Sequence, residues 1–254
     1  MPLLDRDGVR IHYEVHGKGP VVLLSHGYSA TSQMWRGQIA ALSKDHTLVT
    51  WDMRGHGGSD SPDDPARYSA EATVDDMAAL LDTVGAERAV IGGLSLGGYM
   101  SLMFHAKYPQ RVRALLILDT GPGFRKDEAR NGWNQQAART AERFEEEGMA
   151  KVNALKETST GGTHRSATGL ALAARGMLAQ RDATVIESLP GIRVPSLIVV
   201  GADDTPFLQS AEVMAAKIAG SQKVVIPAAG HVANIDQPQA FNDAVLAFLN
   251  TLPA

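Results

Sequence analysis

The sequence predicts an α/β protein in which helices flank a mostly parallel central sheet, and three observations predict it. Short apolar runs alternate with segments of helical periodicity. Residues 21–25 form a continuous apolar run, typical of a strand buried on both faces, whereas residues 9–15 alternate like a half-exposed strand. A long helical stretch then interrupts the alternation. The expected strands are residues 9–15, 21–25, 46–51, 88–91, 113–119, 195–200 and 223–226, and the expected helices are 32–42, 70–84, 99–108, 209–219 and 239–249.

Helix boundaries follow from the residues at the ends of the periodic segments. Thr31 or Ser32 can cap the helix 32–42 by accepting a hydrogen bond from one of its first amides. The helix 70–84 is followed by Gly85, a residue type that favours the left-handed conformation after a helix. Strands and helices that alternate in this order predict a parallel sheet covered on both faces.

The helical stretch at residues 121–190 predicts an inserted cap. Its apolar residues recur at helical spacing between two expected strands. We therefore expect a core built from residues 1–120 and 191–254, with residues 121–190 lying above the strand ends as a lid.

Composition excludes several classes of protein. The chain has 254 residues, 44% of them hydrophobic and 20% charged, which is typical of one large globular domain, with or without an inserted subdomain. A net charge of −4 gives no reason to expect nucleic acid or an anionic membrane as a partner. Without cysteine there is no disulfide, thiolate nucleophile or cysteine-bound metal. No signal peptide or membrane-length apolar run is evident, which predicts a cytoplasmic location.

The strongest indication of chemistry is Ser95, at the centre of Gly93-Leu94-Ser95-Leu96-Gly97. An expected strand precedes this segment and an expected helix follows it. A serine on such a sharp turn occupies strained backbone, and glycines two residues away allow the strand and the helix to pass closely. The pattern predicts a nucleophilic hydroxyl raised above the sheet.

A serine hydroxyl needs a base, and the base needs a carboxylate to orient it. The strand 195–200 ends in Gly201-Ala202-Asp203-Asp204, and His231 follows the strand 223–226. Parallel strands bring such ends to one edge of the sheet. We therefore expect His231 to be the base, while either Asp203 or Asp204 can reach it.

An attacked carbonyl develops an oxyanion that needs preorganised donors. One expected donor is the amide of Leu96, at the start of the helix that follows the nucleophile. The second is expected from the loop after strand 21–25, where Tyr28 is placed to supply it.

With these residues identified, the chain from about Gly8 to Leu249 resembles the α/β-hydrolase superfamily, in particular its small-cap serine esterases and lactonases. The motifs that carry the resemblance are His26-Gly27-Tyr28, residues 52–59, Gly93-Leu94-Ser95-Leu96-Gly97-Gly98, Gly201-Ala202-Asp203-Asp204 and Gly230-His231. The resemblance implies Asp204 as the acid, a structural role for residues 52–59 and substrate selection by the cap. Dehalogenases and epoxide hydrolases of this fold carry aspartate at the nucleophile position, so Ser95 makes both reactions unexpected.

These inferences predict a carboxylesterase that cleaves small, largely uncharged esters through an acyl-enzyme. The main alternative is a lactonase acting on acyl-homoserine lactones or enol-lactones with the same residues. C–C bond hydrolysis, perhydrolysis and a non-catalytic binding role are further alternatives. Trp133, Phe144 and Met177 are candidate substrate contacts in the cap. The partner is then a small molecule, no metal or organic cofactor is implied, and the sequence leaves the oligomeric state open.

Overall fold

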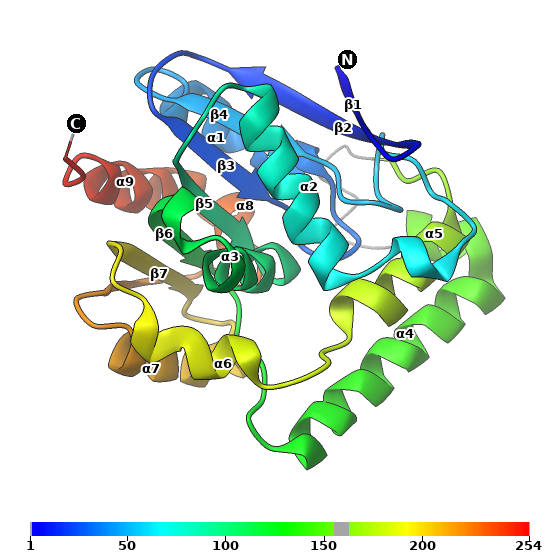
Figure 1. The fold of residues 1–254 in the computed structure, drawn as a ribbon. Helices are drawn as coiled ribbons and strands as arrows, with labels where there is room; N and C mark the ends of the chain where they lie inside the picture. The colour runs from blue at the N-terminus through cyan, green and yellow to red at the C-terminus, as the bar shows by residue number, and fades with distance from the viewer. Residues whose placement is uncertain (1, 155–162, 254) are drawn as a thin grey trace.

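A computed structural model describes residues 2–154 and 163–253, so part of the predicted cap, residues 155–162, lies outside the described residues. In the described chain, eight strands form one sheet in the order β1-β2-β4-β3-β5-β6-β7-β8 (Figure 1). The strands are β1 (Leu3–Arg6), β2 (Val9–His16), β3 (Val21–Ser25), β4 (Thr47–Trp51), β5 (Ala89–Leu94), β6 (Val112–Leu118), β7 (Ser196–Gly201) and β8 (Gln222–Ile226). The pairs β1–β2 and β2–β4 are antiparallel and all other pairs are parallel, which confirms the predicted fold class.

Helices cover both faces of this sheet, as Figure 1 shows. The core helices are α1 (Arg36–Leu42), α2 (Ala70–Thr83), α3 (Leu96–Lys107), α7 (Thr205–Lys217), α8 (Ala233–Asp236) and α9 (Pro238–Leu249). Side chains of α2, α3 and α7 share one apolar cluster with Leu23, whereas α1 and α9 share another with Val22 and Leu24. Successive residues of a strand point to opposite faces, so a continuous apolar strand such as β3 supplies both clusters.

Between β6 and β7 the chain forms α4 (Asp127–Asn153), α5 (Ala167–Ala173), a π-helical turn (Ala174–Leu178) and α6 (Thr184–Ser188). Helices α4 and α5 run side by side at one end of the molecule (Figure 1). They share a small apolar cluster of their own, formed by Ala141, Phe144, Leu170, Ala171 and Ala174. The boundaries of the predicted cap stay a prediction, and the word cap is used below for the helical segment between β6 and β7. None of the described helices combines the length and the hydropathy needed to cross a membrane.

Several elements differ from the expectations. The expected helix 32–42 is divided into a 3-10 helix, Ser32–Trp35, and α1, Arg36–Leu42. Strand β1 was not predicted, because it is short and lies half-exposed at the sheet edge. Helix α7 begins four residues earlier than expected, because Asp204 stands at its N-cap and Pro206 fits the first turn of a helix. Helix α3 begins at Leu96, since Gly97 and Gly98, which suggest a turn in sequence, belong to its first turn.

Backbones pack closely where β5 turns into α3. A Cβ atom at Gly97 would lie 2.2 Å from the carbonyl oxygen of Ser25 in β3. A Cβ at Gly93 would lie 2.4 Å from the carbonyl carbon of Gly97. Real Cβ atoms do not approach backbone this closely, so glycine is required at both positions. The helix and two strands therefore meet through bare backbone.

Gly97→Ala is expected to destabilise the protein by about 3 kcal/mol or more, because backbone, not a flexible side chain, would have to move. Gly132→Ala is the matched control, since Gly132 lies in α4 with no atom within 4 Å of an added Cβ. That substitution should be neutral or stabilise by up to about 1 kcal/mol. Urea unfolding of both variants measures the difference, and equal stabilities would contradict the packing argument.

Candidate active site

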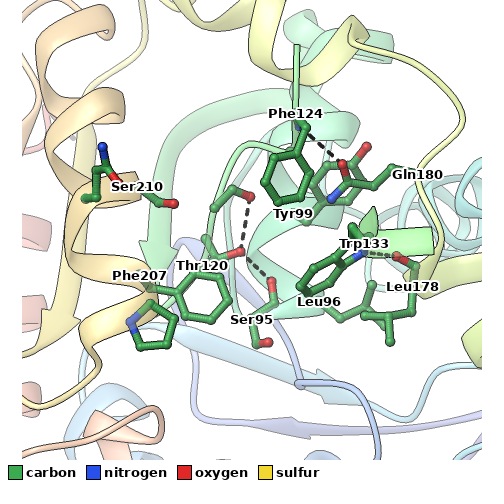
Figure 2. A pocket seen from close by; sticks show the side chains of 14 residues that line it. Ser95, Leu96, Tyr99, Thr120, Phe124, Trp133, Leu178, Gln180, Phe207 and Ser210 are labelled. Carbon is green, nitrogen blue, oxygen red and sulfur yellow. Dashed lines mark hydrogen bonds between the residues drawn. The ribbon is translucent and has the colours of Figure 1, made fainter. Parts of the chain in front are cut away.

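Ser95 occupies the turn between β5 and α3 with a φ of 55° and a ψ of −115°, a conformation that L-residues rarely adopt. Its backbone is held on both sides: its amide donates to the carbonyl of Leu118 at 3.0 Å, and the hydroxyl of Thr120 donates to its carbonyl at 2.6 Å. Figure 2 shows the Ser95 side chain at the base of a pocket. The strain and the hydrogen bonds together hold the half-buried hydroxyl at the sheet edge.

The structure places Asp204, rather than Asp203, against His231. Nδ1 of His231 lies 2.8 Å from a carboxylate oxygen of Asp204, whereas the Asp203 side chain is exposed. Asp204 is only 4% exposed, and Phe207 stacks on the imidazole with ring centroids 4.9 Å apart. A proton on Nδ1 shared with this carboxylate leaves Nε2 as the basic nitrogen.

Two chambers meet at Ser95. The larger chamber, of about 290 Å³, is lined mainly by apolar side chains from α3, the cap and α7, among them Leu96, Tyr99, Phe124, Trp133, Leu178 and Phe207 (Figure 2). The smaller chamber, of about 210 Å³, is lined among others by Gly27, Tyr28, Met34, His231 and Ile235. Ser95 and Leu178 line both chambers, and Ser95 and His231 line the same one.

Tyr28 lies on the loop that follows β3, beside the nucleophile. A Cβ added at the preceding residue, Gly27, would lie 3.5 Å from the Cβ of Ser95. The Tyr28 hydroxyl donates to the carbonyl of Leu170 in α5 at 2.7 Å, and its ring contacts Phe144 edge-on. Burial raises the pKa of this hydroxyl well above its ordinary value. The loop that carries Tyr28 is thus tied to the cap.

Two buried histidines hold the same loop through hydrogen bonds. His26 donates from Nδ1 to the carbonyl of Gly27 at 2.7 Å and accepts from the amide of Met53 at Nε2, at 2.9 Å. His56 accepts from the amide of Ser29 at 3.2 Å, and its other nitrogen donates to a carbonyl two residues earlier. Each ring uses one nitrogen as donor and the other as acceptor, which requires the neutral imidazole.

A third histidine, His164 of the cap, completes this arrangement. Its Nε2 donates to the carbonyl of Ser29 at 2.8 Å, and its Nδ1 accepts from the amide of Gly57 at 3.2 Å. Burial lowers the pKa of all three histidines, and that of His26 to about 4. The three rings are therefore neutral. They position the loop through hydrogen bonds and do not act as acids or bases.

The segment 52–59 has the structural role that the resemblance implied. The carboxylate of Asp52 accepts hydrogen bonds from the amides of Ser32 and Gly58 and from Nδ1 of His12. Burial by itself would raise the pKa of Asp52. The hydrogen bonds and the nearby His26 outweigh this effect, so the pKa of Asp52 is lowered. The ionised carboxylate thus joins the segment to the sheet.

Sequence reasoning missed Asp119, which lies at the end of β6 beside the Asp204 loop. One carboxylate oxygen accepts from the amide of Gly201 at 2.7 Å and the other from the amide of Ala233 at 3.3 Å. Burial, and then the charge of Asp204, raise the pKa of Asp119 to about 7. Asp119 therefore links the loops that carry Asp204 and His231. A carboxylate directly at the end of a central strand was the available signal.

The three predicted cap contacts have different positions. Trp133 lines the larger chamber, and its Nε1 donates to the carbonyl of Leu178 at 2.8 Å. Phe144 is buried in the cap cluster against Tyr28, and Met177 is fully buried in the apolar cluster beneath the cap. Neither Phe144 nor Met177 lines either chamber, because their helical faces point into packed interior. Tyr99, Phe124 and Phe207 form chamber walls that the sequence analysis did not name.

Among residues 2–154 and 163–253, no group of three or more His, Asp or Glu side chains is arranged to hold a metal ion. Neither chamber is lined by a lysine or arginine of these same residues. The described walls of both chambers therefore offer no cationic side chain to a negatively charged substrate.

Comparison with known proteins agrees with this fold and arrangement. Residues 20–173 match the alpha/beta hydrolase fold family. The chain belongs to this family, and the family predicted from its motifs is confirmed.

Its relatives within the family include esterases and lactonases. The chain is 27% identical over 271 residues to 3-oxoadipate enol-lactonase 1 of Acinetobacter baylyi, covering 98% of this chain and 97% of the relative. Its structure is similar to that of a thermophilic esterase from Thermogutta terrifontis with malate bound, with a TM-score of 0.85, 29% identity and coverage of 99% and 97%. The enol-lactonase from Burkholderia xenovorans LB400 gives a TM-score of 0.78 at 27% identity, with coverage of 98% and 100%. The family and these similarities support a hydrolase.

Acidification from pH 6.5 toward pH 4 is expected to destabilise the folded protein. In this range the unfolded chain protonates its histidines, whereas folded His26 stays neutral down to about pH 4. The unfolded state then binds more protons, so the free energy of unfolding falls as the pH falls. His26 alone contributes a loss on the order of 3 kcal/mol. Denaturant unfolding at a series of pH values measures it.

Asp119 has the opposite effect and supplies the control. Its raised pKa means that the folded state holds a proton up to about pH 7, so this group adds stability as the pH falls from 7 toward 4. Asp119→Asn should therefore make the acid-induced loss steeper. A stability that stays level from pH 6.5 to 4 in this variant would contradict the assignment of neutral buried histidines.

Proposed function

We propose that this protein is a serine hydrolase of carboxylic esters that works through an acyl-enzyme. The observation that carries the proposal is the 2.8 Å contact between His231 and buried Asp204, on an imidazole that lines the same chamber as Ser95. A nucleophile, a base and an orienting carboxylate are the groups that acyl transfer to serine requires.

In the proposed mechanism, Ser95 Oγ attacks the ester carbonyl while Nε2 of His231 takes its proton. Asp204 keeps the imidazole in the required tautomer and stabilises its positive charge. The amides of Tyr28 and Leu96 donate to the oxyanion, and the Leu96 amide benefits from its position at the N-terminus of α3. His231 then protonates the leaving alcohol as the C–O bond breaks. A water molecule, deprotonated by His231, attacks the acyl-enzyme and releases the acid.

The two chambers divide the substrate. The leaving oxygen receives its proton from His231, and His231 lines the smaller chamber but not the larger one. The alcohol part is therefore assigned to the smaller chamber and the acyl part to the larger chamber. The absence of lysine and arginine from their described walls supports uncharged acyl and alcohol groups, because a buried carboxylate needs a compensating charge.

Lactone hydrolysis is the second candidate function. Enol-lactonases among the relatives are 27% identical to this chain over nearly its full length. The same residues open a lactone ring by the same steps, except that the leaving alcohol remains attached to the acyl group. The chambers share Ser95 and Leu178, so one cyclic molecule can extend into both.

Ser95→Ala is expected to lower kcat/KM for p-nitrophenyl butyrate by about 10⁶-fold, because it removes the nucleophile. Asp204→Asn should lower it on the order of 10⁴-fold, because the imidazole then favours the wrong tautomer. Asp203→Asn is the matched control, because this neighbouring side chain is exposed, and it should leave the rate unchanged. A Ser95→Ala variant as active as the unmodified protein would refute the mechanism. An unmodified protein without turnover would favour a binding role.

A panel of substrates distinguishes ester from lactone hydrolysis. We expect kcat/KM to be higher for neutral short-chain esters than for acyl-homoserine lactones or enol-lactones. Hydrolysis of each substrate is measured by pH-stat titration. An ester that carries a carboxylate on its acyl group should react more slowly than its neutral analogue, because the described chamber walls lack a cationic side chain. A preference for lactones by orders of magnitude would reverse the order of the two candidate functions.

A further inference from the structure

The larger chamber ends at the side chain of Tyr99, and a second cavity begins on the other side of it. This outer cavity, also of about 290 Å³, is lined among others by Glu71, Met103, Ala106, Arg181, Asp182 and Val185. Tyr99 is the one described residue that lines both spaces. Residues 178–181 also lie between the two spaces, because Leu178 and Gln180 line the chamber whereas Ala179 and Arg181 line the outer cavity. Tyr99 therefore forms part of the wall between the nucleophile chamber and a cavity of equal size.

The position of Tyr99 follows from α3. It lies one helical turn after the nucleophile, and its amide donates to the carbonyl of Ser95 at 3.0 Å. Residues four apart on a helix lie on the same face, so the ring rises beside Ser95. Figure 2 shows the Tyr99 ring next to Phe124 and Gln180, at the end of the chamber away from Ser210. A Cβ added at Gly123 would lie 3.2 Å from Cε2 of Tyr99, so the ring also packs on the backbone there.

Acidic groups of the outer cavity influence Tyr99. Burial, and then the charges of Asp182 and Glu71, raise the pKa of Tyr99 to about 12. Both of these carboxylates line the outer cavity and neither lines the larger chamber. None of the hydrogen bonds found among the described residues involves this hydroxyl, so the ring is held by packing alone.

The outer cavity suits the tail of a longer chain. Met103, Ala106, Ala179 and Val185 supply apolar surface along it, whereas its charged lining residues are Glu71, Lys107, Arg181 and Asp182. At its edge, Arg181 pairs with Glu71 at 3.1 Å, and these side chains are 70% and 42% exposed, so this end reaches the solvent. An extended acyl chain passing Tyr99 would thus contact apolar surface in a cavity that opens to water.

We propose that Tyr99 is the specificity-determining residue that limits acyl-chain length, and that the outer cavity is an extension of the acyl chamber that Tyr99 keeps closed. The inference rests on the proposed ester hydrolysis. It assigns short-chain acyl esters as the substrate class of the unmodified protein and medium-chain acyl esters as the class that removal of the ring admits.

The test is the ratio of kcat/KM for p-nitrophenyl decanoate to that for p-nitrophenyl butyrate. Tyr99→Ala is expected to raise this ratio by about tenfold or more, because the added methylenes then contact the apolar side chains of the outer cavity. Tyr99→Phe retains the ring and should keep the original ratio. If Tyr99→Ala does not fold, Tyr99→Val removes the ring with less loss of packing and carries the same expectation.

A filling variant tests the outer cavity itself. Ala106 is exposed on α3 and lines this cavity, so Ala106→Phe places a ring inside it at a position that tolerates substitution. The double variant Tyr99→Ala/Ala106→Phe should lose the gain in the decanoate-to-butyrate ratio. An unchanged ratio in folded Tyr99→Ala, or a gain that survives in the double variant, would overturn the proposal.

Binding measurements distinguish failure of the role proposed for Tyr99 from failure of the proposed reaction. An unmodified protein that cleaves none of the esters would overturn ester hydrolysis. The role of Tyr99 is then tested by the Kd for decanamide, an uncharged medium-chain probe, measured by titration calorimetry. Tyr99→Ala should lower this Kd by about tenfold, and Ala106→Phe should reverse the effect. Equal Kd values in all variants would overturn the role proposed for Tyr99.

Discussion

The contact on which the rest of the site depends is the approach of helix α3 to strands β3 and β5 through Gly93 and Gly97. Because no side chain separates these backbones, the chain turns from strand to helix within one residue, and that residue must adopt a positive φ. Ser95 accepts this strain because its amide and carbonyl are both hydrogen-bonded. The same turn places the first amide of α3 beside the hydroxyl. One packing constraint thus positions the proposed nucleophile and one proposed oxyanion donor together.

The loop that carries the other proposed donor is held differently, by neutral polar groups. His26 and His56 brace it from the core, whereas His164 and the carbonyl of Leu170 reach it from the cap. Burial keeps these rings uncharged, so each supplies one donor and one acceptor in a fixed direction. The cap therefore has two roles in this structure: it forms the chamber wall through Trp133, and it positions the loop beside Ser95.

Much of the fold and part of the site could be predicted from the sequence. Seven strands and five core helices follow from apolar periodicity, and the order of Ser95, the aspartate pair and His231 follows from strand ends. Spacing alone did not separate Asp203 from Asp204, since the turn decides which carboxylate faces the imidazole; the family resemblance favoured Asp204, and the structure places it there. The cap contacts were harder: Trp133, Phe144 and Met177 all lie on apolar helical faces, but periodicity reports burial and not which cavity a face lines.

By itself, the sequence determined the class of fold, the strained turn at Ser95 and the family, because each depends on local patterns that any folded arrangement must satisfy. Only the tertiary structure decided the pairing of Asp204 with His231, the bridging position of Asp119 and the place of Tyr99 on the walls of two cavities. These features join residues far apart in the chain. Their geometry arises when sheet, helices and cap pack together, and no local pattern of residues encodes the distance between two such elements.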